Sequence, residues 1–229
     1  MSSAIELAVF DMAGTTVEDR DEVLAAFMHA VRDKKLNATE GEVISRMGAS
    51  KVEVFRYFVE RQYGAGNEAR VEEVYESFRN ALENGYRDNG VRAIAGAKET
   101  FAVLRSRGIK VVTTTGFYRK VTNIILEALG WDDRVLDASI CADDVPLGRP
   151  APYMIFRAME ATGVQDVRRV IKLGDTPFDM MAGSRAGVRG VIGVLSGSHT
   201  ADSLGATRHT HIIKSVAELP ELLDREFAE

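Results

Sequence analysis

The sequence has very little cysteine and no long apolar run, and both absences narrow what the protein can be. Cys141 is its one cysteine among 229 residues, so no disulfide can form within the chain, which is typical of a reducing compartment. No apolar run reaches about 18 residues, and no basic segment followed by an apolar one opens the chain. These features predict a cytoplasmic protein without a membrane span or a signal peptide.

The chain also lacks an excess of positive charge. It has 29 lysines and arginines against 34 aspartates and glutamates, for a net charge of −5. Proteins that bind nucleic acids usually present a basic patch, so we expect no nucleic-acid partner. The hydrophobic content of 45% is ordinary for a globular protein, and the chain is long enough to bury a sizeable core.

A short apolar run near the N-terminus ends in a carboxylate. Residues 7–10 read LAVF, Asp11 follows, and Gly14 lies in the next few residues, a pattern typical of a buried strand that ends in a turn. Ligands of open parallel sheets bind beyond the carboxyl ends of the strands, so Asp11 is a candidate nucleophile or metal ligand. On this stretch alone, Asp11 fits equally well as the cap of a turn.

Apolar spacing divides the rest of the chain into two kinds of structure. An early block has helical spacing and no strand-like run, with one capping box at Thr39 and Glu42 and a second at Ser50 and Glu53. Later, short strands alternate with helices, one of which is expected to begin at Pro150. Such alternation implies right-handed crossovers and a mostly parallel sheet.

We therefore predict an α/β fold with two parts. Residues 1–17 and 92–229 would form a Rossmann-like core, and residues 18–91 would form an all-helical cap domain inserted after the first strand. Because the insertion leaves the core just after Asp11, it would lie above the carboxyl ends of the strands. That position suits a mobile lid, although a rigid structural addition is the alternative.

Three further motifs follow the first one in a fixed order. They are TTTG at 113–116, GRP at 148–150 and GDTPFD at 174–179, and they supply threonines, a cation and a pair of carboxylates. The ordered set of four is far more specific than any single motif. It resembles the haloacid dehalogenase-like (HAD) hydrolase superfamily, and the resemblance covers essentially the whole chain.

Three carboxylates of these motifs, Asp11, Asp175 and Asp179, are expected to converge at neighbouring strand ends. Carboxylates this close repel one another unless a cation neutralises them, and oxygen ligands with a phosphate-type substrate favour Mg²⁺. Asp11 would bind the ion with one oxygen and attack phosphorus with the other, while Asp175 would bind directly and Asp179 would support it. The backbone carbonyl of Ala13 would be a further ligand.

The phosphoryl group itself would be held by the second and third motifs. Thr115 and the backbone amide of Gly116 would bind its oxygens, and Arg149 would neutralise the charge that builds up during transfer. Taken alone, Arg149 fits a solvated surface loop better, and only the ordered motif set favours a role in the site.

Ala13 departs informatively from the usual HAD pattern. The resemblance implies a second aspartate at this position, which protonates the leaving oxygen, and one branch with alanine there is phosphonoacetaldehyde hydrolase, or phosphonatase. In that branch a lysine of the cap forms a Schiff base with the aldehyde and serves as an electron sink when the P–C bond breaks. Lys51, in the stretch MGASK, matches that lysine, and Met47 would pack near the imine.

The residues around Lys51 support the same interpretation. Lys51 would be the first residue of the helix capped by Ser50, where the macrodipole disfavours a positive charge. The neutral amine, which is the nucleophilic form, would then be favoured. The plainer alternative is an exposed lysine at a helix start.

Two positions differ from the phosphonatase pattern. Val54 stands where the branch usually has histidine, and Phe117 stands where it usually has tyrosine. The substrate is therefore predicted to be phosphonoacetaldehyde or a close analogue. Alternatives are a HAD phosphatase or phosphosugar mutase acting on a small phosphate ester, and a non-catalytic HAD-fold binding protein.

The resemblance also implies a homodimer that pairs through the caps. Apolar side chains of one cap helix, Phe55, Phe58 and Val59, would allow such pairing. The same three residues fit equally well into the core of the cap itself.

Overall fold

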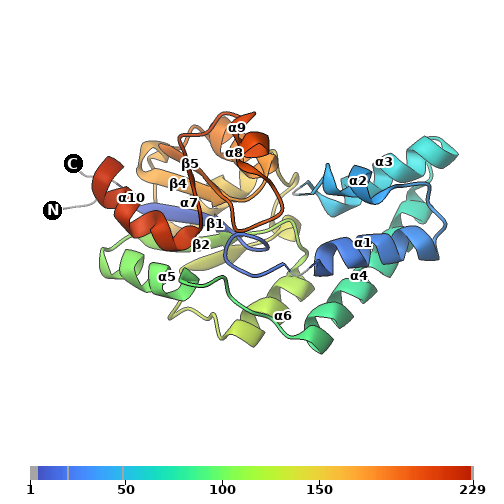
Figure 1. The fold of residues 1–229 in the computed structure, drawn as a ribbon, viewed down its shortest axis with the longest axis horizontal. Coiled ribbons are helices and arrows are strands. Elements are labelled where there is room, and N and C mark those ends of the chain that lie inside the picture. The colour runs from blue at the N-terminus through green and yellow to red at the C-terminus, as the bar shows by residue number, and fades with distance from the viewer. Residues whose placement is uncertain (1–4, 20, 48, 228–229) are drawn as a thin grey trace.

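The structure is a computed structural model that describes residues 5–19, 21–47 and 49–227. In these residues six strands form one parallel sheet, and four helices extend from one end of it (Figure 1). The strand order is β3-β2-β1-β4-β5-β6, so the first strand lies in the middle. The strands are β1 (Leu7–Asp11), β2 (Lys110–Thr114), β3 (Ala138–Ile140), β4 (Val170–Gly174), β5 (Gly190–Val194) and β6 (His211–Ile213).

Alternate residues of β1 enter two separate cores because successive side chains of a strand point to opposite faces. Ala8 and Phe10 belong to one hydrophobic cluster, and Leu7 and Val9 belong to the other. All five residues of β1 are buried, as expected for a central parallel strand covered by helices on both faces. The register places Asp11 beside Thr114 of β2, which brings the first two motifs together.

Helices cover both faces of the sheet. Residues of α5, α6 and α10 pack into the cluster that contains Phe10, and residues of α7, α8 and α9 pack into the cluster that contains Val9. The bounds are α5 (Ala97–Ser106), α6 (Arg119–Leu129), α7 (Tyr153–Thr162), α8 (Pro177–Ala186), α9 (Ala201–Gly205) and α10 (Leu219–Glu226), with 3₁₀ turns at Ala142–Asp144, Val167–Arg169 and Val216–Glu218.

The insertion after β1 is all-helical, as predicted. It consists of α1, α2, α3 and α4, which extend away from the sheet (Figure 1). Phe27 of α1 lies with its ring centroid 4.7 Å from those of both Phe55 and Phe78, so three helices share one aromatic core. The helices are α1 (Glu22–Asp33), α2 (Glu40–Ile44), α3 (Lys51–Tyr63) and α4 (Glu68–Asn89).

The aromatic core decides between the two interpretations of the apolar residues of α3. Phe55, Phe58 and Val59 are each 0% exposed within a single chain. They therefore form the core of the cap and offer no surface to a second copy. Pairing of two chains through the caps stays a prediction that would need other residues of the cap.

Two chain segments connect the insertion to the sheet, and they lie side by side. Val17 forms an antiparallel bridge with Ala93, Glu18 N donates to Arg92 O at 2.9 Å, and Ile94 N donates to Thr16 O at 2.9 Å. The segment that leads from β1 into the insertion and the segment that returns from it to the sheet are thus joined by backbone hydrogen bonds. We predicted a core of residues 1–17 and 92–229 and a cap of residues 18–91, and this division stays a prediction. Its two boundaries lie at these paired segments.

Helix starts follow the sequence in some places and depart from it in others. The capping box of Thr39 and Glu42 is confirmed. Helix α3 begins at Lys51 as predicted, but the Ser50 side chain makes no capping hydrogen bond, so the second capping box is wrong. Pro150 does not begin a helix either, because the chain first carries Arg149 into the interior and α7 starts three residues later. No helix of the described residues is long and apolar enough to cross a membrane.

Candidate active site

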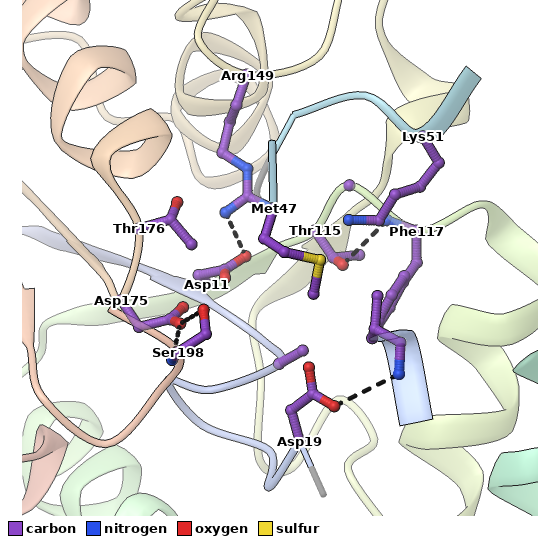
Figure 2. Close-up of a pocket in the computed structure, with 13 residues that line it drawn as sticks. Asp11, Asp19, Met47, Lys51, Thr115, Phe117, Arg149, Asp175, Thr176 and Ser198 are labelled. Atoms are coloured by element: carbon purple, nitrogen blue, oxygen red, sulfur yellow. Dashed lines mark hydrogen bonds and ion pairs between the residues drawn. The ribbon is translucent and has the colours of Figure 1, made fainter. Parts of the chain in front are cut away.

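A cavity lies at the carboxyl ends of the central strands, where the insertion meets the sheet (Figure 2). Its volume is ≈ 30 Å³, which is room for about two water molecules. The pocket is therefore small, and residues from the strand ends and from the insertion line it. Eight of the residues predicted from the motifs line it, namely Asp11, Ala13, Met47, Lys51, Thr115, Gly116, Arg149 and Asp175.

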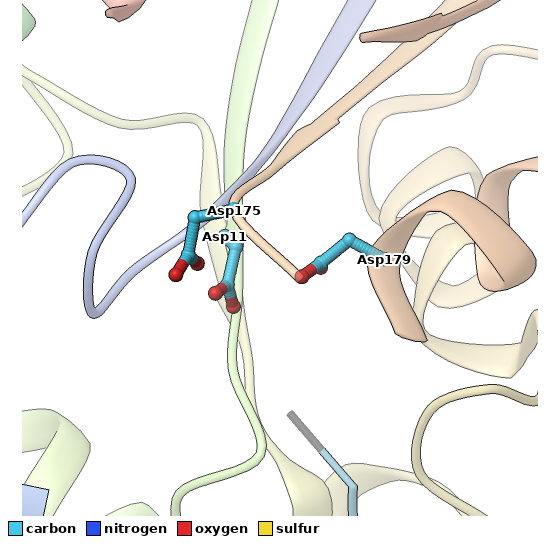
Figure 3. A group of neighbouring side chains, drawn as sticks. All are labelled: Asp11, Asp175 and Asp179. Carbon is cyan, nitrogen blue, oxygen red and sulfur yellow. The ribbon is translucent and has the colours of Figure 1, made fainter. Parts of the chain in front are cut away.

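The three predicted carboxylates come together beside this cavity (Figure 3). Asp11 ends β1, Asp175 follows β4 directly, and Asp179 lies in the first turn of α8. Each offers one oxygen, and these oxygens all lie within 4.8 Å of one another. Burial, and then the charges of the other two carboxylates, raise the pKa of Asp175 to about 7. The cluster is thus under electrostatic strain that a cation would relieve.

Two buried cations already compensate part of this negative charge. Nη1 of Arg149 lies 2.7 Å from Oδ1 of Asp11 and 2.5 Å from Oδ1 of Asp179. Nζ of Lys172 lies 2.9 Å from the same oxygen of Asp179. Burial disfavours the charge of Asp179, but Arg149 and Lys172 outweigh it and hold the pKa of Asp179 below its usual range.

Lys172 was not predicted from the sequence, although the sequence contains a signal for it. It stands in the apolar strand β4, where a lysine is unexpected, and it is 1% exposed. Its Nζ also donates to Oγ1 of Thr114 at 3.0 Å. A charged residue inside an otherwise apolar central strand needs a buried partner, and here that partner is Asp179.

The donor set fits a divalent metal ion at Asp11 and Asp175. Oδ1 of Asp11 is buried, and the Nη1 of Arg149 that it faces in an ion pair is shared with Asp179, to which that nitrogen donates a hydrogen bond. Both oxygens of Asp179 are in use, one by the two cations and the other by the hydroxyl of Thr176 at 2.6 Å. Asp11 and Asp175 therefore suit direct ligation, and Asp179 suits a supporting position.

Two backbone loops are packed against Asp175. Gly14 has φ +80°, and a Cβ there would lie 2.6 Å from Oδ2 of Asp175. A Cβ at Gly197 would lie only 2.0 Å from the same oxygen. The carboxylate also accepts hydrogen bonds from Ser198 N at 3.0 Å and from the hydroxyl of Thr15 at 3.3 Å. Its orientation is therefore fixed by chain segments far apart in sequence.

Thr115 and Gly116 follow β2 and approach the cavity from its neighbouring strand. Oγ1 of Thr115 accepts a hydrogen bond from Phe117 N at 3.1 Å (Figure 2). A Cβ at Gly116 would lie 3.4 Å from Nη2 of Arg149, so the backbone at this residue lies against the guanidinium. The backbone of Gly116 and the guanidinium of Arg149 thus lie on the same side of the cavity.

Lys51 enters the same cavity from the insertion. The side chain is 6% exposed, and its Nζ lies 5.6 Å from the ring centroid of Phe27 and 6.0 Å from that of Phe117. Burial, and then the charge of Arg149, lower the pKa of Lys51 to about 8. We expected a favoured neutral amine from the helix macrodipole, whereas the structure attributes the lowered pKa chiefly to burial.

Four residues of the cavity were not predicted as site residues: Asp19, Val23, Thr176 and Ser198. Thr176 lies inside the GDTPFD motif, which was its signal, whereas Val23 and Ser198 have no pattern that distinguishes them as site residues. Asp19 lies between the first motif and the insertion, and that location was the available signal.

Of the two residues that depart from the phosphonatase pattern, Phe117 lines the cavity and Val54 is buried in the hydrophobic core. Cys141 is buried, and burial raises the pKa of its thiol to about 11, which fits an inert side chain.

Comparison with known proteins agrees with the motif order and the fold. The family model for haloacid dehalogenase-like hydrolases matches residues 8–194. The chain belongs to this family. It is 33% identical to a phosphonoacetaldehyde hydrolase of Bacillus cereus over 231 aligned residues, which cover 96% of this chain and 86% of the relative. A phosphonoacetaldehyde hydrolase of Bacillus anthracis is 32% identical over the same shares.

Solved structures of other HAD-fold proteins show the same architecture. A hydrolase from Pseudomonas syringae superposes with a TM-score of 0.87 at 21% identity, covering 97% of this chain and 100% of that one. A phosphonoacetaldehyde hydrolase-like protein from Oleispira antarctica gives 0.85 at 24% identity, covering 98% and 93%. This chain is thus a HAD hydrolase that is similar to phosphonoacetaldehyde hydrolases.

Proposed function

We propose that this HAD hydrolase is a Mg²⁺-dependent phosphonatase that cleaves the P–C bond of phosphonoacetaldehyde or a close analogue. One observation carries the proposal: the buried amine of Lys51 and the carboxylate of Asp11 line one small cavity. A nucleophile for phosphorus and an amine for an aldehyde are therefore available to two ends of the same small substrate. The similarity to phosphonoacetaldehyde hydrolases supports it.

The phosphorus end would be handled by the residues at the strand ends. A carboxylate oxygen of Asp11 attacks phosphorus, while Thr115, the backbone amide of Gly116 and Arg149 bind the phosphoryl oxygens. A divalent cation held by Asp11, the carbonyl of Ala13 and Asp175, with Asp179 in support, would offset the repulsion between the carboxylates and the anionic substrate. Water then hydrolyses the acyl phosphate and releases inorganic phosphate.

The carbon end would be handled by Lys51. Its lowered pKa of about 8 leaves a useful fraction of neutral amine near pH 7, and the neutral form adds to the aldehyde. The resulting protonated imine accepts the electron pair of the P–C bond as that bond breaks. Such a leaving group needs no acid at oxygen, which accounts for an alanine, Ala13, where most HAD phosphatases have a second aspartate. Met47 would pack beside the imine.

The small volume of the cavity is consistent with a lid role for the insertion. A volume of ≈ 30 Å³ is too small for phosphonoacetaldehyde, so the cap and core would have to separate for the substrate to enter. The paired segments at residues 16–18 and 92–94 are the connection about which such a movement would occur. A homodimer through the caps, implied by the resemblance, is a separate proposal that sedimentation velocity would test.

The test is borohydride trapping. The protein is incubated with phosphonoacetaldehyde and MgCl₂, reduced with sodium borohydride, and analysed by peptide mass spectrometry. We expect a reduced adduct on Lys51 and release of phosphate in unreduced samples. Lys51→Arg, which keeps the charge but cannot form an imine, should give neither.

Other outcomes would redirect the assignment. Phosphate release from simple phosphate esters that survives Lys51→Arg would favour a phosphatase or mutase instead. Binding of Mg²⁺ and phosphate without any turnover would favour a non-catalytic binding protein. No adduct and no phosphate release from phosphonoacetaldehyde would contradict the proposal.

A further inference from the structure

A lysine that works through an imine needs a partner that moves protons. When the imine forms, the aldehyde oxygen must leave as water, and this requires a proton. When the P–C bond breaks, the neutral enamine that remains must gain a proton at carbon. In the proposed phosphonatase function, on which this inference rests, a residue of this chain must supply those protons.

Most titratable side chains of the cavity have other tasks. Asp11 faces phosphorus and is paired with Arg149 at 2.7 Å, and Arg149 keeps its proton at every relevant pH. Asp175 belongs to the carboxylate cluster and is held by Ser198. Phe117, whose ring lies 6.0 Å from Nζ of Lys51, has no proton to give. Among the described residues that line the cavity, one carboxyl remains, that of Asp19.

Asp19 is placed to reach both the reaction and the solvent. It lines the inner cavity together with Lys51, entering from the side opposite Arg149 (Figure 2). It also lines a second cavity of ≈ 260 Å³, whose walls include Asp21, Leu24 and Ile44 of the insertion. Because Asp19 is only half-buried and borders both cavities, a proton that it gives up can be replaced from the solvent.

The surroundings of Asp19 suit a proton donor. Burial raises the pKa of its carboxyl, and the charge of Glu22 adds to this, while the hydrogen bond from Val23 N and the charge of Lys51 oppose it. That hydrogen bond is long, at 3.5 Å, so it restrains the carboxyl without engaging it strongly. The mutual influence of Asp19 and Lys51 shows that the two groups lie within electrostatic reach of each other.

We propose that Asp19 is the proton-transfer residue for the Lys51 imine. In the first step Nζ bonds to the aldehyde carbon, the carbonyl π bond opens, and a proton passes from Nζ to the carbonyl oxygen. The protonated carboxyl of Asp19 then gives its proton to the resulting hydroxyl, which leaves as water as the protonated imine forms. Asp19 then recovers a proton from the outer cavity. After phosphoryl transfer to Asp11, the electron pair of the P–C bond lies in the enamine, and Asp19 protonates its carbon. Water finally hydrolyses the protonated imine to acetaldehyde and the free amine, and the proton released returns to Asp19.

Asp19→Asn is the decisive variant because the amide oxygen still accepts from Val23 N while the transferable proton is lost. We expect the rate of adduct formation in borohydride trapping to fall by about 10²–10⁴-fold, the usual worth of general acid catalysis. The affinity for Mg²⁺, measured by calorimetry, should not change. Asp88→Asn, which removes one charge from an exposed position of α4, is the matched control and should trap at the wild-type rate.

A second variant separates chemistry from structure. Asp19→Ala opens space beside Lys51. Added formate, which supplies a small carboxyl group, should raise the trapping rate of this variant at least tenfold, in a concentration-dependent way. A residue that merely holds the loop in place would show no such rescue, so its absence would overturn the proposal. An unchanged trapping rate in Asp19→Asn would also overturn it while leaving the phosphonatase function intact. Absence of any adduct in the wild-type protein would instead remove the function on which it rests.

Discussion

Arg149 contacts Asp11 directly, with Nη1 2.7 Å from Oδ1 of the carboxylate. The same nitrogen lies 2.5 Å from Oδ1 of Asp179, so one guanidinium end joins two of the three carboxylates. All three side chains are at most 4% exposed. In the proposed reaction, a phosphoryl group that reaches Asp11 would therefore also meet Arg149, which would couple binding of the anion to orientation of the proposed nucleophile.

Replacing Arg149 by lysine should reduce kcat by about 10²–10³-fold. A single ammonium cannot reproduce the planar guanidinium that bridges Asp11 and Asp179 while its other end, Nη2, lies against Gly116. Phosphate release from phosphonoacetaldehyde is the measurement. Arg157→Lys, in an exposed ion pair with Glu160, should leave kcat unchanged, and an equal loss in both variants would contradict a specific role for Arg149.

Lys172→Met should destabilise the fold by about 3–5 kcal/mol because it leaves Asp179 buried with one cation fewer. The control is Lys110→Met, which removes an exposed lysine that begins β2 and lies 3.2 Å from Asp137. That change should cost less than about 1 kcal/mol. Urea unfolding followed by circular dichroism measures both. A similar midpoint for the two variants would show that the buried pair contributes little.

Trapping of the imine should follow the lowered pKa of Lys51. The neutral amine is the reactive form, so in Asp19→Asn, which has no carboxyl proton to titrate beside the amine, the trapping rate should rise about tenfold per pH unit below pH 8 and level off above it. With a lysine of the ordinary pKa, 10.5, the trapping rate would keep rising until the pH reaches that value. The measurement is the initial rate of adduct formation between pH 6 and pH 10. A midpoint near 10.5 would mean that Lys51 is solvated during the reaction.

Mg²⁺ should stabilise the protein more at pH 8 than at pH 5.5. The folded-state pKa of Asp175, about 7, lies above its ordinary 3.8, so the metal-free protein holds an extra proton between these values. The stability due to that proton is fully present below pH 3.8 and is lost as the pH rises through 7. Metal must displace the proton below pH 7 and competes poorly there.

Thermal unfolding in MgCl₂ and in EDTA at the two pH values tests this dependence. At a metal concentration of 100 times Kd and pH 8, the stabilisation should be about 2.7 kcal/mol. Equal shifts of the midpoint at both pH values would mean that Asp175 is not a ligand.

Gly197→Ala should weaken metal binding at least tenfold. The new Cβ would lie 2.0 Å from Oδ2 of Asp175, so the carboxylate or the loop must move. Gly41→Ala is the matched control, since a Cβ there meets nothing within 4 Å and alanine favours the helix α2. Isothermal titration with MgCl₂ measures the affinity. Unchanged binding in Gly197→Ala would place the metal away from Asp175.

The sequence by itself determined the order of the motifs, the parallel sheet and the helical insertion. Apolar runs fix where strands form, and parallel strands bring their carboxyl ends to one edge, so Asp11, Thr115 and Asp175 had to meet. The start of α3 at Lys51 was also predicted, from Ser50 and Glu53 as a capping box, and the position is confirmed although Ser50 makes no capping hydrogen bond. These features depend on local pattern and on a few general rules of topology.

Only the tertiary structure decided which groups are buried and what they face. Lys172 compensates Asp179 because β4 and α8 pack together, and Asp19 borders two cavities because the insertion meets the loops at the carboxyl ends of the strands. The lowered pKa of Lys51 comes mainly from burial between segments distant in sequence. Burial and charge pairing are sums over such contacts, and no local pattern of the sequence contains them.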